Sequence, residues 1–449
     1  MLLEENAPQV AFPAYTVDGM LNKLDLTRVA DEEVTASLPR PNLEGVAPGE
    51  LVAEIIATVR EGGDSALSHY AEKFDGRMPK YLAVPDSELA LALNSISAEL
   101  REALEDAANR IQNFHETQVL EAEVTNDGEI AIETKHQPVM RAGCYVPGGR
   151  AAYPSTLLMT AIPAKVAGVK EVIVCVPPDA SGSVNQATLA AAKIAGVTAV
   201  YAVGGAQAIA AMAYGTETIP AVDVIVGPGN LYVATAQRQV AGDVGIASSF
   251  AGPSEIVVIA DKSASPKYAA IDLIVQAEHG PDGLAWLISW EQEVIDKILS
   301  ELELMVSVSG RKEMITETFV NGGYAVLVKG PQQAMEVANT VAPEHLQLMI
   351  SEPRSLLGLL QNAGAVFLGN MSPASVGDYV AGPSHVLPTH GSARFAGALT
   401  VADFCKDIHI ISVEDSALEQ IGKSVIEIAE AEGLSGHADS IRVRLEGES

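Results

Sequence analysis

The chain has 449 residues, 48% of them hydrophobic, and its 58 acidic residues outnumber 28 basic ones to give a formal net charge of −30. This length predicts two or more lobes rather than one core. The charge argues against nucleic acid and anionic membranes as partners, because binding phosphate groups needs clustered Lys and Arg. We interpret it as an aid to solubility, as in a salty cytoplasm.

Targeting signals and disulfides are not expected. No apolar stretch reaches the 18 residues of a membrane-spanning helix, and the residues after Met1 lack the basic start and apolar core of a signal peptide. The three cysteines, Cys144, Cys175 and Cys405, are odd in number and far apart. We therefore expect no disulfide framework and a reducing, cytoplasmic location.

The first part of the chain is predicted to be helical after an irregular start. Prolines interrupt residues 1–40, which we predict to form an N-terminal arm with residues 1–19 as an extension. Apolar residues at helical spacing indicate helices over 51–59, 67–74 and 89–113. We assign 41–140 to the same lobe as 255–390.

After Met140 short apolar runs alternate with helical segments. Helices are predicted over 187–195, 206–214 and 332–340; one further helix begins at Leu231, and another ends at His279. Strands are predicted at 172–176, 199–203, 222–226, 256–260, 284–290, 324–328 and 365–368. Strands of about five residues alternating with helices favour parallel sheets with right-handed crossovers. We therefore predict an α/β fold with two incomplete Rossmann-like lobes and extended terminal segments, one lobe spanning 141–254.

The alternation ends after Gly391. An amphipathic helix is predicted over 416–432, and the tail beyond it is polar. Because 391–449 has little apolar content for a core of its own, we expect it to pack on another lobe or another subunit.

Three glycine-rich turns stand where predicted strands end: Val146-Pro147-Gly148-Gly149, Gly204-Gly205-Ala206-Gln207 and Gly227-Pro228-Gly229-Asn230. None is a Gly-x-Gly-x-x-Gly fingerprint or a P-loop, so each can be a tight turn without a ligand. In a parallel sheet, however, all three would open on the edge where ligands bind. Their shared edge favours a ligand.

The segment Gln276-Ala-Glu-His279 closes an apolar helix before Gly280 and Pro281. Gln276 and His279 share one helix face, and they can form a capped helix end, with His279 as a dipole partner, or half of a metal site with nitrogen and oxygen ligands.

Other polar residues interrupt apolar or turn-rich sequence farther along the chain. Glu344 and His345 are either an acid–base pair or a solvated turn. Asp378 is either a hard oxygen ligand or a turn cap, and His437 is either a nitrogen ligand or a surface residue.

Eleven ordered blocks make the chain from about Met20 onward similar to the histidinol dehydrogenase family, although no single block would suffice. The blocks are Leu24-Asp-Leu, Tyr145-Val-Pro-Gly-Gly, Pro163-Ala-Lys-Val-Ala-Gly168, Gly204-Gly-Ala-Gln, Gly227-Pro-Gly-Asn, Ala251-Gly-Pro-Ser-Glu255, Gln276-Ala-Glu-His, Ala342-Pro-Glu-His, Gly377-Asp-Tyr, His385-Val-Leu-Pro-Thr and the tail from Glu432 to His437.

The resemblance implies an aldehyde-dehydrogenase-like fold and a zinc enzyme that oxidises L-histidinol to L-histidine through L-histidinal with two NAD+, the last step of histidine biosynthesis. It also implies a homodimer in which residues 391–449 reach the partner's site. By this resemblance the zinc ligands would be Gln276, His279, Asp378 and His437, and the catalytic pair would be Glu344 and His345. The substrate would contact Ser254, His385 and Glu432, in addition to the four zinc ligands and His345. NAD would contact Tyr145, Gln207 and Asn230.

Two positions depart from the family pattern, and both concern the expected substrate pocket. The stretch from Gly245 to Phe250 lacks the usual Asp, and Ser384 stands where the family usually has Asn. Three other functions are considered: a zinc and NAD enzyme for another alcohol such as a sulfonated diol, an aldehyde-dehydrogenase-like thiol enzyme using Cys144, and a catalytically inactive ligand-binding protein. A small buried hydrophobe explains Cys144 better than a nucleophile does.

Overall fold

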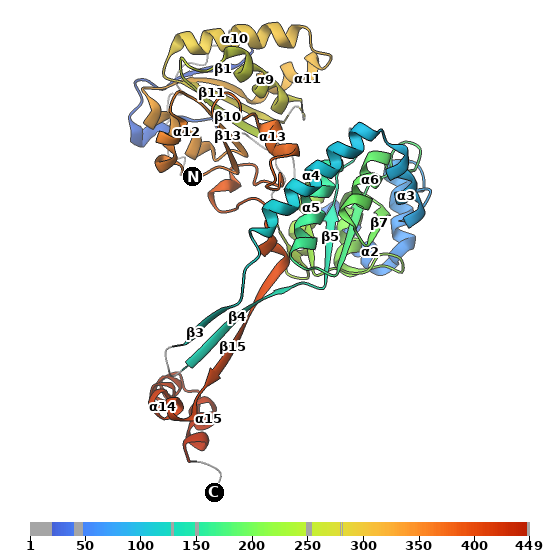
Figure 1. Cartoon of the computed structure of the whole chain (residues 1–449), viewed down its shortest axis with the longest axis vertical. Coiled ribbons are helices and arrows are strands. Elements are labelled where there is room, and N and C mark those ends of the chain that lie inside the picture. Colours follow the sequence, from blue (N-terminus) through green and yellow to red (C-terminus); the bar gives the residue numbers. More distant parts are fainter. Residues whose placement is uncertain are drawn as a thin grey trace, which may run out of the picture.

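The computed structural model describes residues 20–39, 48–126, 130–148, 152–247, 254–278, 280 and 282–446. Two α/β lobes lie side by side, and a thin arm extends from them and ends in two helices (Figure 1). The predicted α/β class with Rossmann-like parallel sheets is confirmed. In the described part of the chain, none of the helices combines the length and the apolar character that crossing a membrane requires.

The first lobe contains a six-stranded sheet in the order β2-β7-β6-β5-β8-β9. Its strands are β2 (Ala83–Val84), β5 (Arg141–Tyr145), β6 (Glu171–Val176), β7 (Ala199–Ala202), β8 (Val224–Val226) and β9 (Gly245–Ile246), connected by α5 (Pro154–Val166), α6 (Gln186–Ala195), α7 (Gly205–Tyr214) and α8 (Leu231–Val240). All pairings are parallel except that of the short β2. The central strands are buried on both faces, as continuous apolar runs predict.

Three helices before this sheet also belong to the first lobe. α2 (Gly49–Tyr70), which runs into a π-helical turn at Ala71–Asp75, packs on α7 and α8; α3 (Asp86–Ser95) packs on α6, and α4 (Ala98–Glu116) packs on α5. The assignment of 41–140 to the other lobe is therefore wrong for these helices. Their apolar faces, including Val59 and Ile111, complete the two cores of the first sheet.

The single helix predicted over 89–113 is two helices. Ile96 is extended, with φ −72° and ψ 159°, and ends α3. Ser97 then caps α4, because its hydroxyl accepts a 3.1 Å hydrogen bond from the backbone N–H of Leu100.

The second lobe contains a fully parallel sheet in the order β1-β12-β11-β10-β13-β14. Its strands are β1 (Asn22–Asp25), β10 (Glu255–Ala260), β11 (Leu284–Ser289), β12 (Gly323–Leu327), β13 (His345–Met349) and β14 (Ala365–Leu368). β1 comes from the predicted N-terminal arm, so this part of 1–40 is an edge strand of the second lobe.

Helices cover both faces of the second sheet. α9 (Pro266–Ala277), α10 (Gln292–Ser307) and α11 (Lys312–Gly322) share one core with Ile256 and Val258, while α1 (Val34–Ser37) and α12 (Pro331–Val341) share the other with Val257 and Trp286. Short 3₁₀ turns lie at Asp31–Glu33 and Pro353–Leu359, and α13 (Ala374–Tyr379) follows β14.

The arm is an antiparallel sheet that the sequence did not predict. Its strands are β3 (Glu123–Asn126), β4 (Ile130–Pro138) and β15 (Cys405–Val413), in the order β15-β4-β3. β15 is reached through 3₁₀ turns at Ser392–Arg394 and Val401–Phe404. At the far end of the arm lie α14 (Asp415–Ala431), which confirms the predicted amphipathic helix, and α15 (Ser435–Glu446) (Figure 1).

The order of strands reverses at β5 in the first sheet and at β10 in the second, because later strands add on the opposite side of each. The three glycine-rich turns do follow β5, β7 and β8, at the carboxyl edge of the first sheet. At this edge Gly227 has φ +114°, and an added Cβ would clash with the carbonyl oxygen of Tyr145.

We predict that Gly227→Ala destabilises the first lobe by about 1–3 kcal/mol more than Gly242→Ala, because only the first methyl group meets a backbone atom. Gly242 is the matched control, since its φ is +105° and nothing lies within 4 Å of the position that an added Cβ would take. Urea unfolding followed by circular dichroism measures the difference. Equal losses in the two variants would show that Gly227 is required for its φ alone.

Candidate active site

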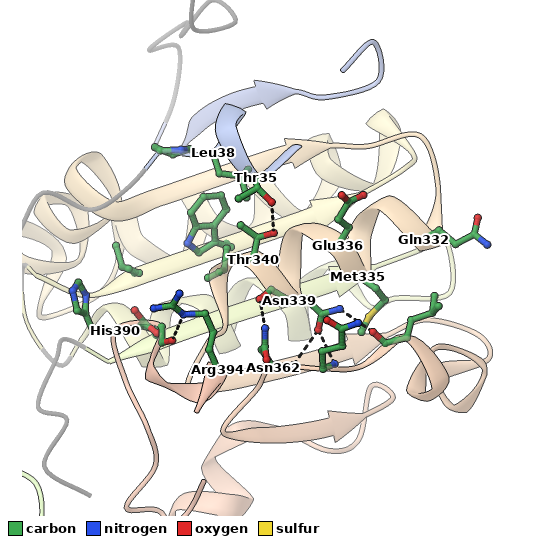
Figure 2. A pocket seen from close by; sticks show the side chains of 18 residues that line it. Thr35, Leu38, Gln332, Met335, Glu336, Asn339, Thr340, Asn362, His390 and Arg394 are labelled. Atoms are coloured by element: carbon green, nitrogen blue, oxygen red, sulfur yellow. Dashed lines mark hydrogen bonds between the residues drawn. The ribbon is translucent and has the colours of Figure 1, made fainter. Parts of the chain in front are cut away.

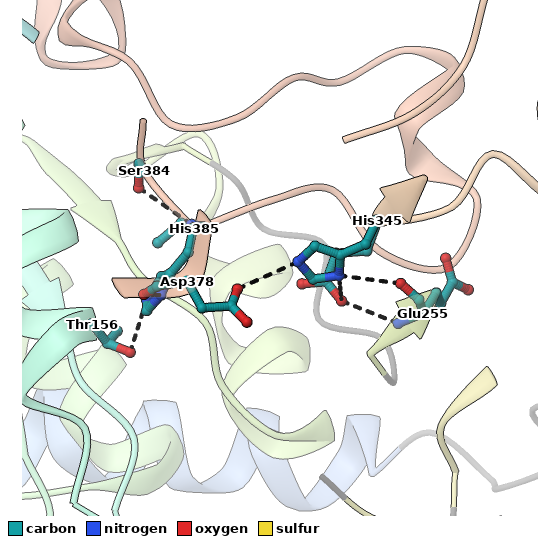
Figure 3. Close-up of polar contacts among 8 residues, drawn as sticks. Thr156, Glu255, His345, Asp378, Ser384 and His385 are labelled. Carbon is teal, nitrogen blue, oxygen red and sulfur yellow. Dashed lines mark hydrogen bonds and ion pairs between the residues drawn. The ribbon is translucent and has the colours of Figure 1, made fainter. Parts of the chain in front are cut away.

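Glu344 and His345 lie at the amino end of β13, where α12 turns into the strand through Ala342 at φ +51°. Both are buried, with exposed fractions of 9% and 3%. The backbone N–H of Glu255 donates a 3.1 Å hydrogen bond to Oε2 of Glu344, and the Glu255 carbonyl oxygen lies 3.3 Å from His345 Nδ1 (Figure 3). A solvated Glu-His turn is therefore excluded.

Asp378, on α13, is the second acid beside this histidine. Its Oδ1 lies 3.4 Å from Nε2 of His345, while Oε2 of Glu344 lies 3.7 Å from Nδ1 on the other side of the ring (Figure 3). The imidazole is thus placed between two carboxylates. A ring in this position can accept and release protons while its orientation is held from both sides.

The buried position of this group shifts its proton equilibria. Burial raises the pKa of Glu344, because the charged form loses solvation. Burial alone would lower the pKa of His345, but the carboxylates of Glu344 and Asp378 outweigh that effect and raise it to about 9. Charge on Asp378 contributes part of the rise, so a cation bound by that carboxylate would reduce it.

His385 joins α13 to the first lobe. A carbonyl oxygen can only accept, so His385 Nδ1 donates to the Asp378 carbonyl over 2.8 Å, and in the neutral ring Nε2 accepts from the Thr156 hydroxyl over 3.1 Å. Thr156 belongs to α5, so the site lies where the two lobes meet (Figure 3).

Ser384, one of the two departures from the family pattern, serves the same contact between lobes. Its buried hydroxyl donates to the Met159 carbonyl of α5 over 3.0 Å and accepts from the Val386 N–H over 3.2 Å. Of the other departure only 245–247 belong to the described residues, because 248–250 lie outside them.

Gln276 lies in the last turn of α9 and is 3% exposed. α9 and α13 share a core that includes Ala277 and Ala374. His279 lies outside the described residues. Ser254 directly precedes β10, beside Glu255.

The structure does not bring the remaining predicted residues to this group within one chain. Glu432 ends α14 and His437 lies in α15, at the far end of the arm (Figure 1). Among the residues that the structure describes, no group of three or more His, Cys, Asp or Glu side chains lies close enough to hold a metal ion.

The predicted NAD residues stand at the carboxyl edge of the first sheet. Tyr145 ends β5, and its hydroxyl accepts a 3.1 Å hydrogen bond from the Gly205 N–H. Gln207 lies buried in the first turn of α7, and Asn230 caps α8 by accepting from two backbone N–H groups. A cavity of about 210 Å³ at the ends of β5 and β6 is lined by residues that include Gly148 and Asp179.

Glu255 has a second environment on the opposite face of the second sheet. Its side chain lines a cavity of about 770 Å³ between α12, α1 and the segment containing His390 and Arg394 (Figure 2). Burial and the nearby charge of Glu344 raise the pKa of the Glu255 carboxyl to about 8. No sequence pattern pointed to a role for Glu255 or Thr156, although Glu255 ends one of the blocks shared with the family.

Known proteins give a consistent comparison. A family model described as histidinol dehydrogenase matches residues 39–445. The chain is 46% identical over 399 residues to a histidinol dehydrogenase of Parasynechococcus marenigrum, covering 87% of this chain and 90% of the relative. It is 47% identical over 399 residues to one of Pseudomonas fluorescens, covering 88% and 90%.

A solved structure agrees with these relatives. The crystal structure of histidinol dehydrogenase from Elizabethkingia anophelis superimposes with a TM-score of 0.91 at 33% identity, covering 96% of this chain and 99% of that one.

We predict that Cys144 does not react in the native protein. Cys144 and Cys175 are fully buried, and burial raises the pKa of Cys144 to about 12, so almost no thiolate forms near neutral pH. Iodoacetamide at about pH 8, with peptide mass spectrometry, should modify the part-exposed Cys405 first and reach the other two only in urea. Rapid alkylation of native Cys144 would support the thiol-enzyme alternative.

Proposed function

Because the chain belongs to the histidinol dehydrogenase family, we propose that it oxidises L-histidinol to L-histidine through L-histidinal, reducing two NAD+, as the last step of histidine biosynthesis. The observation that carries the proposal is the buried Glu344–His345 pair, held by the Glu255 backbone and flanked by Asp378. The three free cysteines support a reducing, cytoplasmic setting.

His345 is the proposed base for the first oxidation. The alcohol must lose its hydroxyl proton and a hydride, and NAD+ supplies the hydride acceptor in both oxidations. In its neutral form, which a cation bound by Asp378 would favour by lowering the pKa of His345, the imidazole can take the hydroxyl proton. The two carboxylates then stabilise the imidazolium that forms.

Glu344 is the proposed base for the second oxidation. The aldehyde carbonyl first adds water, and Glu344 takes a proton from that water as the new C–O bond forms. The hydrate anion left after this proton transfer would become the carboxylic acid on losing its hydride, for which the second NAD+ would be the acceptor. The N–H of Glu255 fixes Oε2 of Glu344 and so leaves the other carboxylate oxygen to face the water.

We assign the zinc ligands to Gln276, His279, Asp378 and His437. Nitrogen and oxygen donors suit zinc, and the buried amide of Gln276 together with the Asp378 carboxylate beside His345 fits such a site. When bound, the ion would bind the imidazole and amino nitrogens of the substrate and so act as a template and Lewis acid.

His437 supports the proposed homodimer. It lies at the end of the arm, far from Gln276 of its own chain, so a second copy of the chain would have to supply it to the site (Figure 1). The arm offers exposed apolar side chains on β15, including Ile410 and Ile411, for such a contact. Glu432, which precedes His437 in the arm, would reach the substrate by the same route.

The remaining substrate contacts are assigned to the junction of the two lobes, and the NAD contacts to the first lobe. Ser254 precedes the strand that carries Glu255, and His385 lies between Asp378 and the first lobe, so both border the proposed substrate position. Tyr145, Gln207 and Asn230 are assigned to NAD, because ligands of parallel sheets bind at the carboxyl edge where strand order reverses.

Turnover tests the proposal directly. The purified full-length chain, loaded with zinc, should form two NADH for each L-histidinol and release L-histidine, measured by absorbance and chromatography. A sulfonated diol at equal concentration is the comparison substrate. Oxidation of the diol in preference to L-histidinol would reassign the substrate, and absence of NADH with either would favour an inactive binding protein.

We predict that Glu344→Gln slows the second oxidation by about 100-fold or more, as expected for loss of a general base, and the first by less than about tenfold. The amide is isosteric and still offers an oxygen to the Glu255 N–H, so the fold is preserved. Stopped-flow single turnovers from histidinol and from histidinal separate the steps. The exposed Glu352→Gln is the control, and equal slowing of both steps would contradict the assignment.

A further inference from the structure

The Gln347 side chain is buried inside the second lobe and contacts two other elements. It is fully buried in β13, and its Nε2 donates to Oδ2 of Asp272 over 2.6 Å and to the Ser372 carbonyl oxygen over 3.3 Å. Asp272, on α9, is itself only 6% exposed. One amide nitrogen thus links a strand, a helix and the loop before α13.

Each of these elements carries a residue of the proposed site. Asp272 is four residues before Gln276, so the two side chains share a face of α9. Gln347 is two residues after His345, so both point to the same side of β13. Ser372 precedes α13, which begins at Ala374 and contains Asp378.

Packing alone does not account for this arrangement. The surrounding core is apolar, and includes Ala269, Leu273 and Met349. Burying a carboxylate and an amide costs free energy that apolar side chains of the same shape would not cost. Moreover, Oε1 of Gln347 is buried without a hydrogen-bond partner among the described residues. The buried polar pair therefore points to a role beyond packing.

We propose that Gln347 is a positioning residue, which together with Asp272 and the Ser372 carbonyl sets the relative positions of Gln276, His345 and Asp378. The proposal rests on the proposed function, because it takes Gln276 and Asp378 as metal ligands. Residues that hold metal ligands from outside the coordination shell orient those ligands, and loss of such residues commonly lowers metal affinity by about 10–100-fold.

Three variants of the full-length protein test this. Gln347→Leu removes both donated bonds. Asp272→Asn keeps an oxygen acceptor for Gln347 Nε2 and is the conservative variant. The double variant Asp272→Leu with Gln347→Leu replaces the polar pair by apolar side chains and so restores stability without restoring the bonds.

The matched control lies at the opposite edge of the same sheet. There the Ser351 hydroxyl donates a 2.9 Å hydrogen bond to Oδ2 of the buried Asp261. Ser351→Ala removes a bond to a buried carboxylate, as Gln347→Leu does, but far from the proposed ligands. It therefore reports what the loss of such a bond does without any change at the site.

Zinc affinity is measured on the metal-free protein by competition with a chromophoric chelator, and amide hydrogen exchange is followed over residues 372–380. Gln347→Leu and the double variant should lose about tenfold or more in zinc affinity and exchange faster over this segment. Asp272→Asn and Ser351→Ala should stay within about threefold of the parent in affinity, with unchanged exchange there.

Recovery of zinc affinity in the double variant along with its melting temperature would overturn the proposal, because the defect would then follow stability alone. Unchanged affinity and exchange in Gln347→Leu would overturn it as well. Neither readout needs substrate, so a parent protein that binds zinc but does not oxidise L-histidinol would contradict the proposed function and leave this test valid. If the parent binds no zinc, the exchange over 372–380 decides alone.

Discussion

The hydrogen bond from the Glu255 N–H to the Glu344 carboxylate is the constraint on which the site depends. A carboxylate that is 9% exposed needs a donor, and here the donor is a backbone group that cannot rotate away. The bond joins β10 and β13, the two strands between which the order of the second sheet reverses. Since the adjacent carbonyl of Glu255 faces His345, one residue places both members of the pair.

The two lobes use opposite edges of their sheets. In the first lobe the glycine-rich turns and the predicted NAD residues lie at the carboxyl edge, as is usual for parallel sheets. In the second lobe Glu344, His345 and Ser254 lie at the amino edge. The hydrogen bonds between His385 and Thr156 and between Ser384 and Met159 join the lobes at this point. The site thus lies where the two lobes meet.

Much of the fold could be predicted from the sequence because the central strands are buried on both faces. Runs such as 172–176 and 256–260 are continuously apolar, and β6 and β10 occupy these positions. β13 was not predicted, because polar Gln347 and His345 interrupt its pattern, and only their burial in the fold explains them. The apolar faces of α2 to α4 predicted helices correctly, but a helix face does not specify which of two sheets it covers.

The candidate site, too, could be predicted only in part from the sequence. Glu344, His345 and Asp378 were proposed from the sequence, and the structure brings them together. The groups that hold them are less visible in sequence: the Glu255 N–H lies 89 positions from Glu344, and Thr156 lies 229 positions from His385. Backbone donors have no sequence signature, and such distant pairs are joined only by the topology. The positions of His437 and His279 relative to the pair remain predictions.

The arm has a consequence for how the chain is made. β4 pairs with β3 close by in the sequence, but its other neighbour is β15, and His136 lies 271 positions before its partner Asp407. A ribosome therefore finishes the β3–β4 hairpin long before the third strand exists, and one edge of β4 stays open to wrong pairing in the meantime. Glu133 and Lys135 place charges along this strand, which discourages pairing with another nascent chain while β15 is still untranslated.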